Sequence, residues 1–364
     1  MARLSLRLRP WESFRASQTP IEIRKPRLNR AREYVKVLGK KIKNIVLRII
    51  LVNIQSDTVA ILGTGVWGST LGAIVKSNGH HVRFWSHRGD VALESVIREA
   101  KIVVSAVSMK GVIPTANKLQ SLTIPPQQII VTATKGLDST TTSTPSQIWQ
   151  TALPENSIVV LSGPNLSQEI AKGLPAATVL ASRNLSAAQQ VQKIFASDTF
   201  RVYVNQDPIG TELGGTIKNV IAIASGVCDG MNLGTNAKAA LLTRALPEMV
   251  RIGTHLGASK ETFFGLSGLG DLIATCDSSL SRNYQVGYGL AHGKTLEQIL
   301  EELEGTAEGV NTTNVLVKIA DLEAIAVPIA RQVYRLLKGK ISPDEAIQAL
   351  MERDLKPEFC DLDF

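Results

Sequence analysis

The chain has 364 residues, of which 44% are hydrophobic and 20% charged, enough for two domains that each bury a core. Its formal net charge of +8 arises in residues 1–55, which hold 14 Lys and Arg against three Glu, so the rest of the chain is slightly acidic. Overall charge therefore predicts no nucleic-acid partner, and the apolar run at 45–52, which Arg48 interrupts, is too short for a transmembrane helix.

Residues 1–55 form an Arg-rich extension that is poor in acids and has no sustained periodicity. Three interpretations stay open: a disordered basic tail, a transit peptide, or an upstream segment read from an early start site. Residues 33–53 could form a basic amphipathic helix. We expect a cytoplasmic protein, or a plastid protein if the extension is a transit peptide.

The three cysteines, Cys228, Cys276 and Cys360, are widely spaced and form no CxxC pair. This pattern favours a reducing compartment and predicts no structural metal.

From Thr58 onward, strand and helix signals alternate in the pattern of a parallel sheet covered by helices. The helical period then continues alone after Pro208. We therefore predict an α/β fold with a Rossmann-type, mostly parallel sheet domain at 56–206, an all-helical domain at 207–357 and a tail at 358–364. The expected strands are 58–62, 81–87, 102–107, 128–134, 157–165, 175–182 and 200–205.

The segment GTGVWG, residues 63–68, fits G-x-G-x-x-G between the first strand and a helix that runs to about Asn78. In that context the pattern is typical of a dinucleotide-binding turn. Gly63 makes the tight turn, Gly65 lets the backbone approach a pyrophosphate, and the helix start supplies free amides. The competing interpretation is that Gly63, Gly65 and Gly68 form an ordinary glycine-rich turn that binds no dinucleotide.

After the second strand, where a NAD-selective site would place an acid, the sequence has Ser-His-Arg. His87 and Arg88 can neutralise a 2′-phosphate, so NADP is an expected cofactor beside NAD. The alternative for Arg88 is a solvated loop charge.

Lys218 lies in the middle of GTELGGTIKNVIAIASGVCDG, a predicted helix of small and apolar residues at 210–230. Its helical neighbours include Gly214 and Gly215 and no acid, so no carboxylate on the same helix face pairs with it. A buried lysine loses hydration and its pKa falls, which suits it to donate a proton to a carbonyl oxygen. The competing interpretation is a lysine that extends to solvent.

Two further segments hold polar groups that could serve the same site. Asp271 lies between the apolar segments GLSGLG and LIAT, where an acid needs a partner such as Lys218. Ser281, Arg282 and Asn283 precede a helix and could hold a phosphate monoester. Taken alone, Asp271 is a loop acid and Ser-Arg-Asn is a helix start.

Over roughly residues 57–357 the chain resembles the bacterial NAD(P)-dependent glycerol-3-phosphate dehydrogenases. The resemblance rests on six segments in this order: GTGVWGSTLG, TKGLD, LSGPN, the helix around Lys218, GLGDLIATC and SRN. The resemblance implies reversible reduction of dihydroxyacetone phosphate to sn-glycerol 3-phosphate, for phospholipid synthesis. It implies Lys218 and Asp271 as catalytic residues. Substrate contacts would come from Lys135, Gly163, Asn165, Lys218, Asp271, Thr275, Ser281, Arg282 and Asn283. Cofactor contacts would come from Gly63, Gly65, Val66, Trp67, Gly68, His87, Arg88, Lys135, Arg282 and Glu308.

The segment between the second and third strands is shorter than in most of this family, which resembles its cyanobacterial branch. We expect a homodimer that acts on a phosphorylated triose. Two other functions stay open: a related two-domain dehydrogenase for a 3-hydroxy acid or a sugar acid, and a non-catalytic NADP-binding sensor or scaffold.

Overall fold

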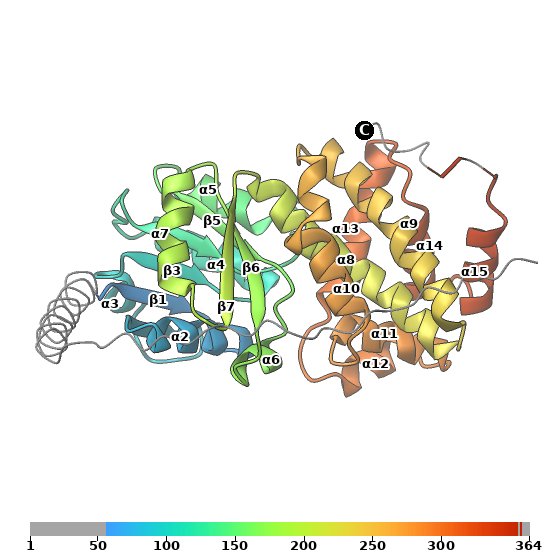
Figure 1. Ribbon diagram of the computed structural model, residues 1–364, viewed down its shortest axis with the longest axis horizontal. Helices are drawn as coiled ribbons and strands as arrows, with labels where there is room; N and C mark the ends of the chain where they lie inside the picture. Colours follow the sequence, from blue (N-terminus) through green and yellow to red (C-terminus); the bar gives the residue numbers. More distant parts are fainter. Residues whose placement is uncertain (1–55, 356, 359–364) are drawn as a thin grey trace, which may run out of the picture. The chain divides into compact units, whose positions relative to one another are not determined.

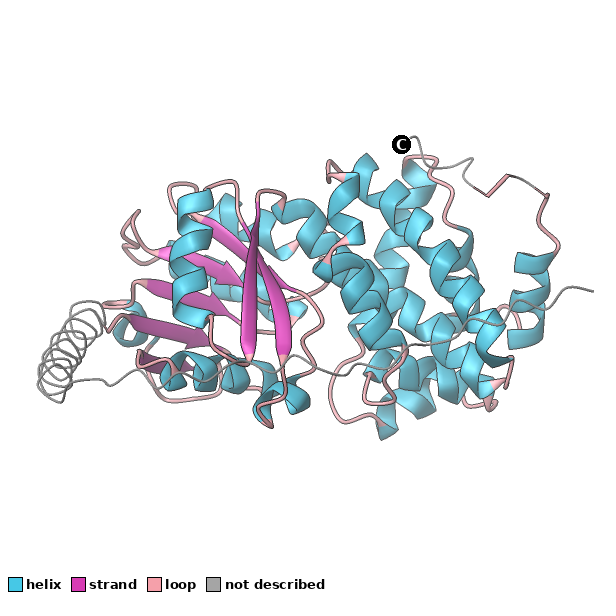
Figure 2. Ribbon diagram, in the orientation of Figure 1, coloured by secondary structure: helices cyan, strands magenta, loops and turns pink. Residues whose placement is uncertain are grey.

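The computed structural model describes residues 56–355, 357 and 358. The basic extension, the helix predicted at 33–53, Cys360 and residues 359–364 of the predicted tail lie outside this part. Within it, strands occur only up to Asn205, and helices alone follow from Pro208 (Figure 1, Figure 2). This arrangement confirms the predicted fold class. No helix in the described part is long and apolar enough to cross a membrane.

The sheet has seven strands in the order β2-β1-β3-β4-β5-β6-β7, and every neighbouring pair is parallel except β5 with β6. Its middle strands are buried on both faces, which explains their continuous Val and Ile runs. The strands are β1 (Thr58–Leu62), β2 (His81–Trp85), β3 (Ile102–Ser105), β4 (Ile129–Thr132), β5 (Ile158–Ser162), β6 (Ala176–Ala181) and β7 (Phe200–Asn205).

Five strands end earlier than predicted, and β6 does so by a single residue. β2, β3, β4 and β5 stop at Trp85, Ser105, Thr132 and Ser162 because the residues that follow leave the ladder for loops. Since these strands are parallel, the four loops emerge at one edge of the sheet, where α/β proteins bind ligands. The segments concerned are 86–88, 106–108, 133–136 and 163–166.

Helices cover both faces of the sheet. One core joins the sheet to α2 (Val66–Ser77), α6 (Ser167–Ala171) and α7 (Leu185–Phe195). The other joins it to α3 (Leu93–Ile97), α4 (Met109–Gln120) and α5 (Pro145–Ala152). Each layer supplies the apolar cover that a two-sided buried sheet requires.

The helical part is built around α8 (Pro208–Gly230), which is buried over most of its 23 residues. Asp207 caps its start by accepting a hydrogen bond from the Gly210 amide at 2.9 Å. The other helices are α9 (Gly234–His255), a 3-10 turn (Lys260–Phe264), a π-helical turn (Leu266–Gly270), α10 (Asp271–Cys276), α11 (Arg282–Ala291), α12 (Leu296–Glu302), α13 (Glu308–Leu322), α14 (Pro328–Leu337) and α15 (Pro343–Met351).

The start of α8 is attached to the sheet part. The buried Glu212 carboxylate accepts hydrogen bonds from the amide and hydroxyl of Ser146 at the start of α5. The Thr216 hydroxyl accepts a bond from the Gly136 amide at 3.0 Å. These bonds cross the predicted boundary near residue 206. The division into two domains stays a prediction.

Candidate active site

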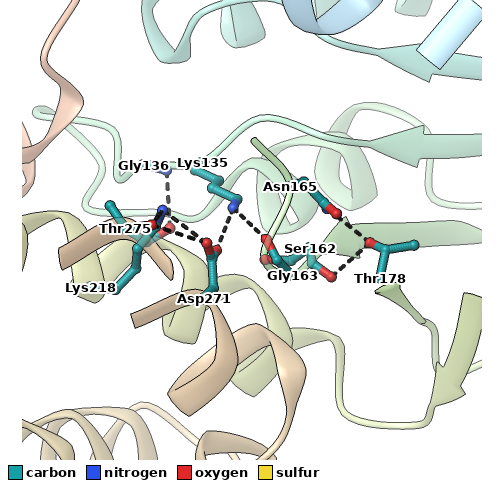
Figure 3. Close-up of polar contacts among 10 residues, drawn as sticks. Lys135, Gly136, Ser162, Gly163, Asn165, Thr178, Lys218, Asp271 and Thr275 are labelled. Atoms are coloured by element: carbon teal, nitrogen blue, oxygen red, sulfur yellow. Dashed lines mark hydrogen bonds and ion pairs between the residues drawn. The ribbon is translucent and has the colours of Figure 1, made fainter. Parts of the chain in front are cut away.

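Lys218 lies in the third turn of α8, and its side chain is only 8% exposed. It does not extend to solvent. Its Nζ lies 3.0 Å from Oδ1 of Asp271 and donates a hydrogen bond to the Thr275 hydroxyl (Figure 3). The structure therefore shows the ion pair expected from the sequence, and it adds a neutral oxygen to the ammonium's partners.

Asp271 is the first residue of α10, directly after the π-helical turn, rather than a loop residue. Thr275 follows one helical turn later on the same face and donates its hydroxyl proton to Oδ1 of Asp271 at 3.2 Å. One short helix thus presents both partners of Lys218. π-Helical turns are frequent at functional sites, because they displace the residues that follow from regular helical positions.

Lys135 reaches the same carboxylate from the loop after β4. Its Nζ donates to Oδ2 of Asp271 at 2.5 Å and to the Gly163 carbonyl at 3.2 Å (Figure 3). The Asp271 side chain is 3% exposed. Its carboxylate forms ion pairs with two ammonium groups, that of Lys135 from the sheet part and that of Lys218 from the helical part. Two cations beside one buried carboxylate leave a net positive charge, which suits an anionic substrate.

Burial lowers the pKa of Lys218 from 10.5 to about 8. Asp271 opposes this shift, and the positive charge of Lys135 adds to it. At neutral pH the group is still an ammonium, but its proton is far easier to remove than that of an exposed lysine.

Two orphan polar atoms lie in the loop and strand end beside Lys135. Asn165 donates from Nδ2 to the Thr178 hydroxyl at 2.9 Å, and its buried Oδ1 has no partner among the described residues. The buried Ser162 hydroxyl also has none. A methyl group at Gly215 would overlap that hydroxyl and come within 3.2 Å of the Lys135 side chain, so only glycine lets α8 lie this close.

The glycine turn has the spatial properties that a dinucleotide requires. Gly63 adopts a φ of 109°, and a Cβ there would lie 2.7 Å from the Ala106 carbonyl oxygen. A Cβ at Gly65 would meet nothing within 4 Å, whereas one at Gly68 would collide with the Gly63 carbonyl. The open space at Gly65 lies at the start of α2, next to the exposed Val66 and the half-buried Trp67.

His87 and Arg88 are exposed and follow β2, beside this turn. The Gly63 amide donates to the Trp85 carbonyl at 2.8 Å, which fixes the end of β2 against the turn. Lys118 of α4, which the sequence did not single out, places its Nζ 3.4 Å from the His87 ring.

The Ser-Arg-Asn segment forms the start of α11. The Ser281 hydroxyl caps the helix by accepting from the Tyr284 amide at 3.3 Å. The buried Asn283 uses Oδ1 to accept from the Gly309 amide at 2.9 Å. Asn283 therefore also holds α13 in place, a structural role that its sequence context does not indicate.

Arg282 is exposed and lies near Glu308, the first residue of α13. Burial raises the pKa of Glu308, against the effect of the Met109 amide at the start of α4 and of the charges of Arg282 and Lys110. Arg282 forms no hydrogen bond with Lys218 in the described part of the chain. The predicted residues thus form three groups: one at the glycine turn and the end of β2, one around Asp271, and one at the starts of α11 and α13.

The described residues contain no group of three His, Cys, Asp or Glu that could hold a metal ion. The arrangement around Asp271 is suited instead to proton transfer and to holding an anion.

Comparison with known proteins identifies relatives of both parts. The N-terminal part of NAD-dependent glycerol-3-phosphate dehydrogenase matches residues 58–94 and 89–188, and its C-terminal part matches residues 207–348. A protein named glycerol-3-phosphate dehydrogenase (NAD(P)+) from Acaryochloris marina is 62% identical over 308 residues, covering 85% of this chain and 99% of the relative. The protein of the same name from Synechocystis is 62% identical over 305 residues, covering 84% of this chain and 96% of the relative.

A solved structure gives the same result. The crystal structure of glycerol-3-phosphate dehydrogenase from Coxiella burnetii is similar to this chain with a TM-score of 0.78 and 32% identity, covering 82% of this chain and 99% of that one. The cyanobacterial relatives agree with the predicted resemblance to that branch. The chain belongs to the NAD-dependent glycerol-3-phosphate dehydrogenase family.

Proposed function

We propose that the protein interconverts dihydroxyacetone phosphate and sn-glycerol 3-phosphate, with NADP or NAD as the cofactor. The observation that supports this proposal is the buried Lys218–Asp271 ion pair. Lys135 binds the same Asp271 carboxylate, and the Thr275 hydroxyl accepts a hydrogen bond from the Lys218 ammonium. The names of the relatives support the choice of substrate. The product would supply the glycerol backbone of phospholipids.

The residues of the glycine turn fit a dinucleotide. The open space at Gly65 accepts a pyrophosphate, and the first amides of α2 have no acceptor within the helix. The other cofactor contacts that we propose are Val66, Trp67, His87, Arg88, Lys135, Arg282 and Glu308. When bound, the nicotinamide supplies the hydride for reduction or takes it up for oxidation.

Lys218 would give its proton to the substrate oxygen as the carbonyl carbon is reduced, and it would take the proton back in the reverse direction. Asp271 keeps the ammonium in position and stabilises its charge, while Thr275 limits its rotation. Because the pKa of Lys218 is about 8, both protonation states are accessible near neutral pH.

Lys135 and Asn165 would orient the substrate oxygens. The Lys135 ammonium stabilises the negative charge that develops on the carbonyl oxygen, in a site largely shielded from water. The unpartnered Oδ1 of Asn165 can accept a hydrogen bond from a substrate hydroxyl. Gly163 contributes the carbonyl that holds Lys135.

The substrate phosphate would lie at Ser281, Arg282 and Asn283, where an exposed guanidinium stands at the start of α11. Binding energy from this remote group would hold the carbonyl in place.

The test is the oxidation of NADPH or NADH by dihydroxyacetone phosphate, followed by absorbance. We expect turnover with this substrate and little with dihydroxyacetone, 3-hydroxy acids or sugar acids. Turnover of a 3-hydroxy acid or sugar acid at a rate equal to or above that with dihydroxyacetone phosphate would contradict the proposal. Binding of the cofactor without any turnover would indicate a sensor. The homodimer and the cytoplasmic or plastid location stay predictions.

A further inference from the structure

A cluster of basic side chains lies outside the site around Asp271, at the end of β2. It consists of His87 and Arg88 from the loop after β2 and Lys118 from the last turn of α4. All three are exposed. None of them forms an ion pair with a carboxylate in the described part of the chain. The one acid in this loop, Asp90, is exposed and has no hydrogen-bond or ion-pair partner among the described residues.

Packing holds Lys118 in this cluster. Its Nζ lies 5.5 Å from the centre of the Trp85 ring, and that ring is buried in the core between the sheet and α4. The Trp85 and His87 rings are 6.5 Å apart at an angle of 57°. The lysine therefore lies against an aromatic surface that also positions the histidine.

The contact between Lys118 and His87 determines the histidine tautomer. The Lys118 Nζ lies 3.4 Å from Nδ1 of His87, and an ammonium has no lone pair with which to accept. Nδ1 must therefore be the acceptor, which places the ring proton on Nε2. The cluster then offers two cationic side chains, Lys118 and Arg88, and the Nε2–H of His87 as a hydrogen-bond donor.

We propose that Lys118 binds the 2′-phosphate of NADP together with His87 and Arg88, and that it determines the preference for NADP over NAD. This inference rests on the proposed NAD(P) function. A phosphate monoester carries a charge of about −1.5 to −2 near neutral pH, which two cations neutralise. The loop follows the strand whose end is fixed to the glycine turn, where NAD-selective proteins place a ribose-binding acid.

Lys118 also has a purely structural alternative role. It lies in the last turn of α4, where a positive charge interacts favourably with the helix dipole. A structural lysine would affect both cofactors equally, because NAD and NADP differ only at the 2′ position. Discrimination between the two cofactors therefore separates the alternatives.

The experiment measures dissociation constants of NADPH and NADH by calorimetric titration of the full chain, without turnover. We compare Lys118→Gln, which removes the charge, with Lys118→Arg, which keeps it. The matched control is Lys193→Gln, another exposed lysine in the last turn of a helix that covers the sheet.

Lys118→Gln is expected to weaken NADPH binding by about tenfold and to leave NADH binding within about twofold, since one charge-assisted contact is lost. Lys118→Arg is expected to retain most of the NADPH affinity, and Lys193→Gln to change neither cofactor. Unchanged NADPH binding by Lys118→Gln, or equal weakening of NADH, would overturn the assignment.

A second titration separates this inference from the proposed function. Adenosine 2′,5′-bisphosphate and adenosine 5′-monophosphate differ only by the phosphate in question. We expect Lys118→Gln to bind the bisphosphate more weakly and the monophosphate as the wild type does. If the wild-type protein bound neither NADH nor NADPH, the proposed function itself would fail; if it bound both and Lys118→Gln did not discriminate, only the role of Lys118 would fail.

Discussion

Lys218 on α8 and Asp271 on α10 form a buried ion pair of 3.0 Å at the end of a π-helical turn. The pair is not isolated, because Lys135 from the sheet part binds the second oxygen of the same carboxylate. Burial lowers the pKa of Lys218, and the charge of this shared carboxylate opposes that shift.

The first prediction concerns the pH dependence of the wild-type enzyme. Reduction requires the ammonium form of Lys218, whereas oxidation requires the neutral amine. Because burial lowers the pKa of Lys218 to about 8, kcat for reduction should fall as pH rises through about 8, and kcat for oxidation should rise there. Initial rates in both directions across this range measure the effect. Flat profiles in both directions would show that another group carries the proton.

Asp271→Asn should shift this profile. The negative charge of Asp271 raises the pKa of Lys218, so its removal lets burial and Lys135 lower that pKa further. We expect the reduction limb to move to lower pH and kcat near neutral pH to fall by on the order of tenfold. The matched control is Asp277→Asn at the other end of α10, whose carboxylate is 81% exposed and pairs with Lys238. A profile identical to that of the wild type in Asp271→Asn would contradict the assigned role.

Gly65→Ala should separate cofactor binding from folding. The added methyl group meets no atom within 4 Å, and the backbone φ of −69° is normal for alanine. We expect the stability to change by less than about 1 kcal/mol, because the cap and entropy effects are small and opposed. Cofactor binding should weaken by roughly tenfold or more, since the methyl group occupies the space for the pyrophosphate.

Gly68→Ala provides the contrast for that variant. A Cβ at Gly68 collides with the Gly63 carbonyl, so this change should lower the thermal midpoint. Calorimetric titration and thermal melting measure the two effects separately. Wild-type cofactor affinity in Gly65→Ala would contradict the location of the pyrophosphate.

Glu212→Gln should alter the dependence of stability on pH. Burial raises the pKa of Glu212 from 4.5 to about 7, against the hydrogen bonds from Ser146. The folded state therefore holds an extra proton between these values, and stability falls as pH rises through the window, by up to about 1.4 kcal/mol per pH unit. Lys218 adds no slope there, because it is protonated in both states below about pH 8.

The measurement compares unfolding free energies of the wild type and Glu212→Gln from about pH 5 to pH 7.5, the range over which the two proton counts differ. Relative to the wild type, the variant should gain stability as pH rises. Glu248→Gln is the matched comparison, since burial also raises the pKa of Glu248 to about 7. A constant difference between the wild type and Glu212→Gln would show that Glu212 has the same charge in both states.

The sequence predicted the fold class because strand runs and the glycine turn are local signals. It also predicted the Lys218–Asp271 pair, because a buried lysine without a helical neighbour of opposite charge needs a distant acid. The strand ends were less predictable: Ala106 and Thr134 continue the apolar and β-branched pattern, but both lie beyond the ends of β3 and β4. Hydrophobicity does not indicate where a hydrogen-bonded pairing stops.

The contacts that were missed join segments far apart in the chain. Nothing in TKGLD indicates that Lys135 shares the carboxylate of Asp271, since that contact depends on how α8 packs against the sheet. In the sequence Lys118 is an ordinary lysine near the end of a helix. Only the structure shows that α4 places it beside His87. The sequence predicts Asn283 as a phosphate ligand, but its side-chain oxygen Oδ1 accepts a hydrogen bond from the Gly309 amide. Pairings of this kind arise only from tertiary structure.

The most direct test of the central claim is the turnover of Lys218→Met with dihydroxyacetone phosphate and NADPH. This side chain keeps the apolar length of lysine and lacks the proton. We predict that kcat falls by on the order of 10² or more and that NADPH still binds as tightly as to the wild type. Near-normal turnover in the folded variant would contradict Lys218 as the proton donor.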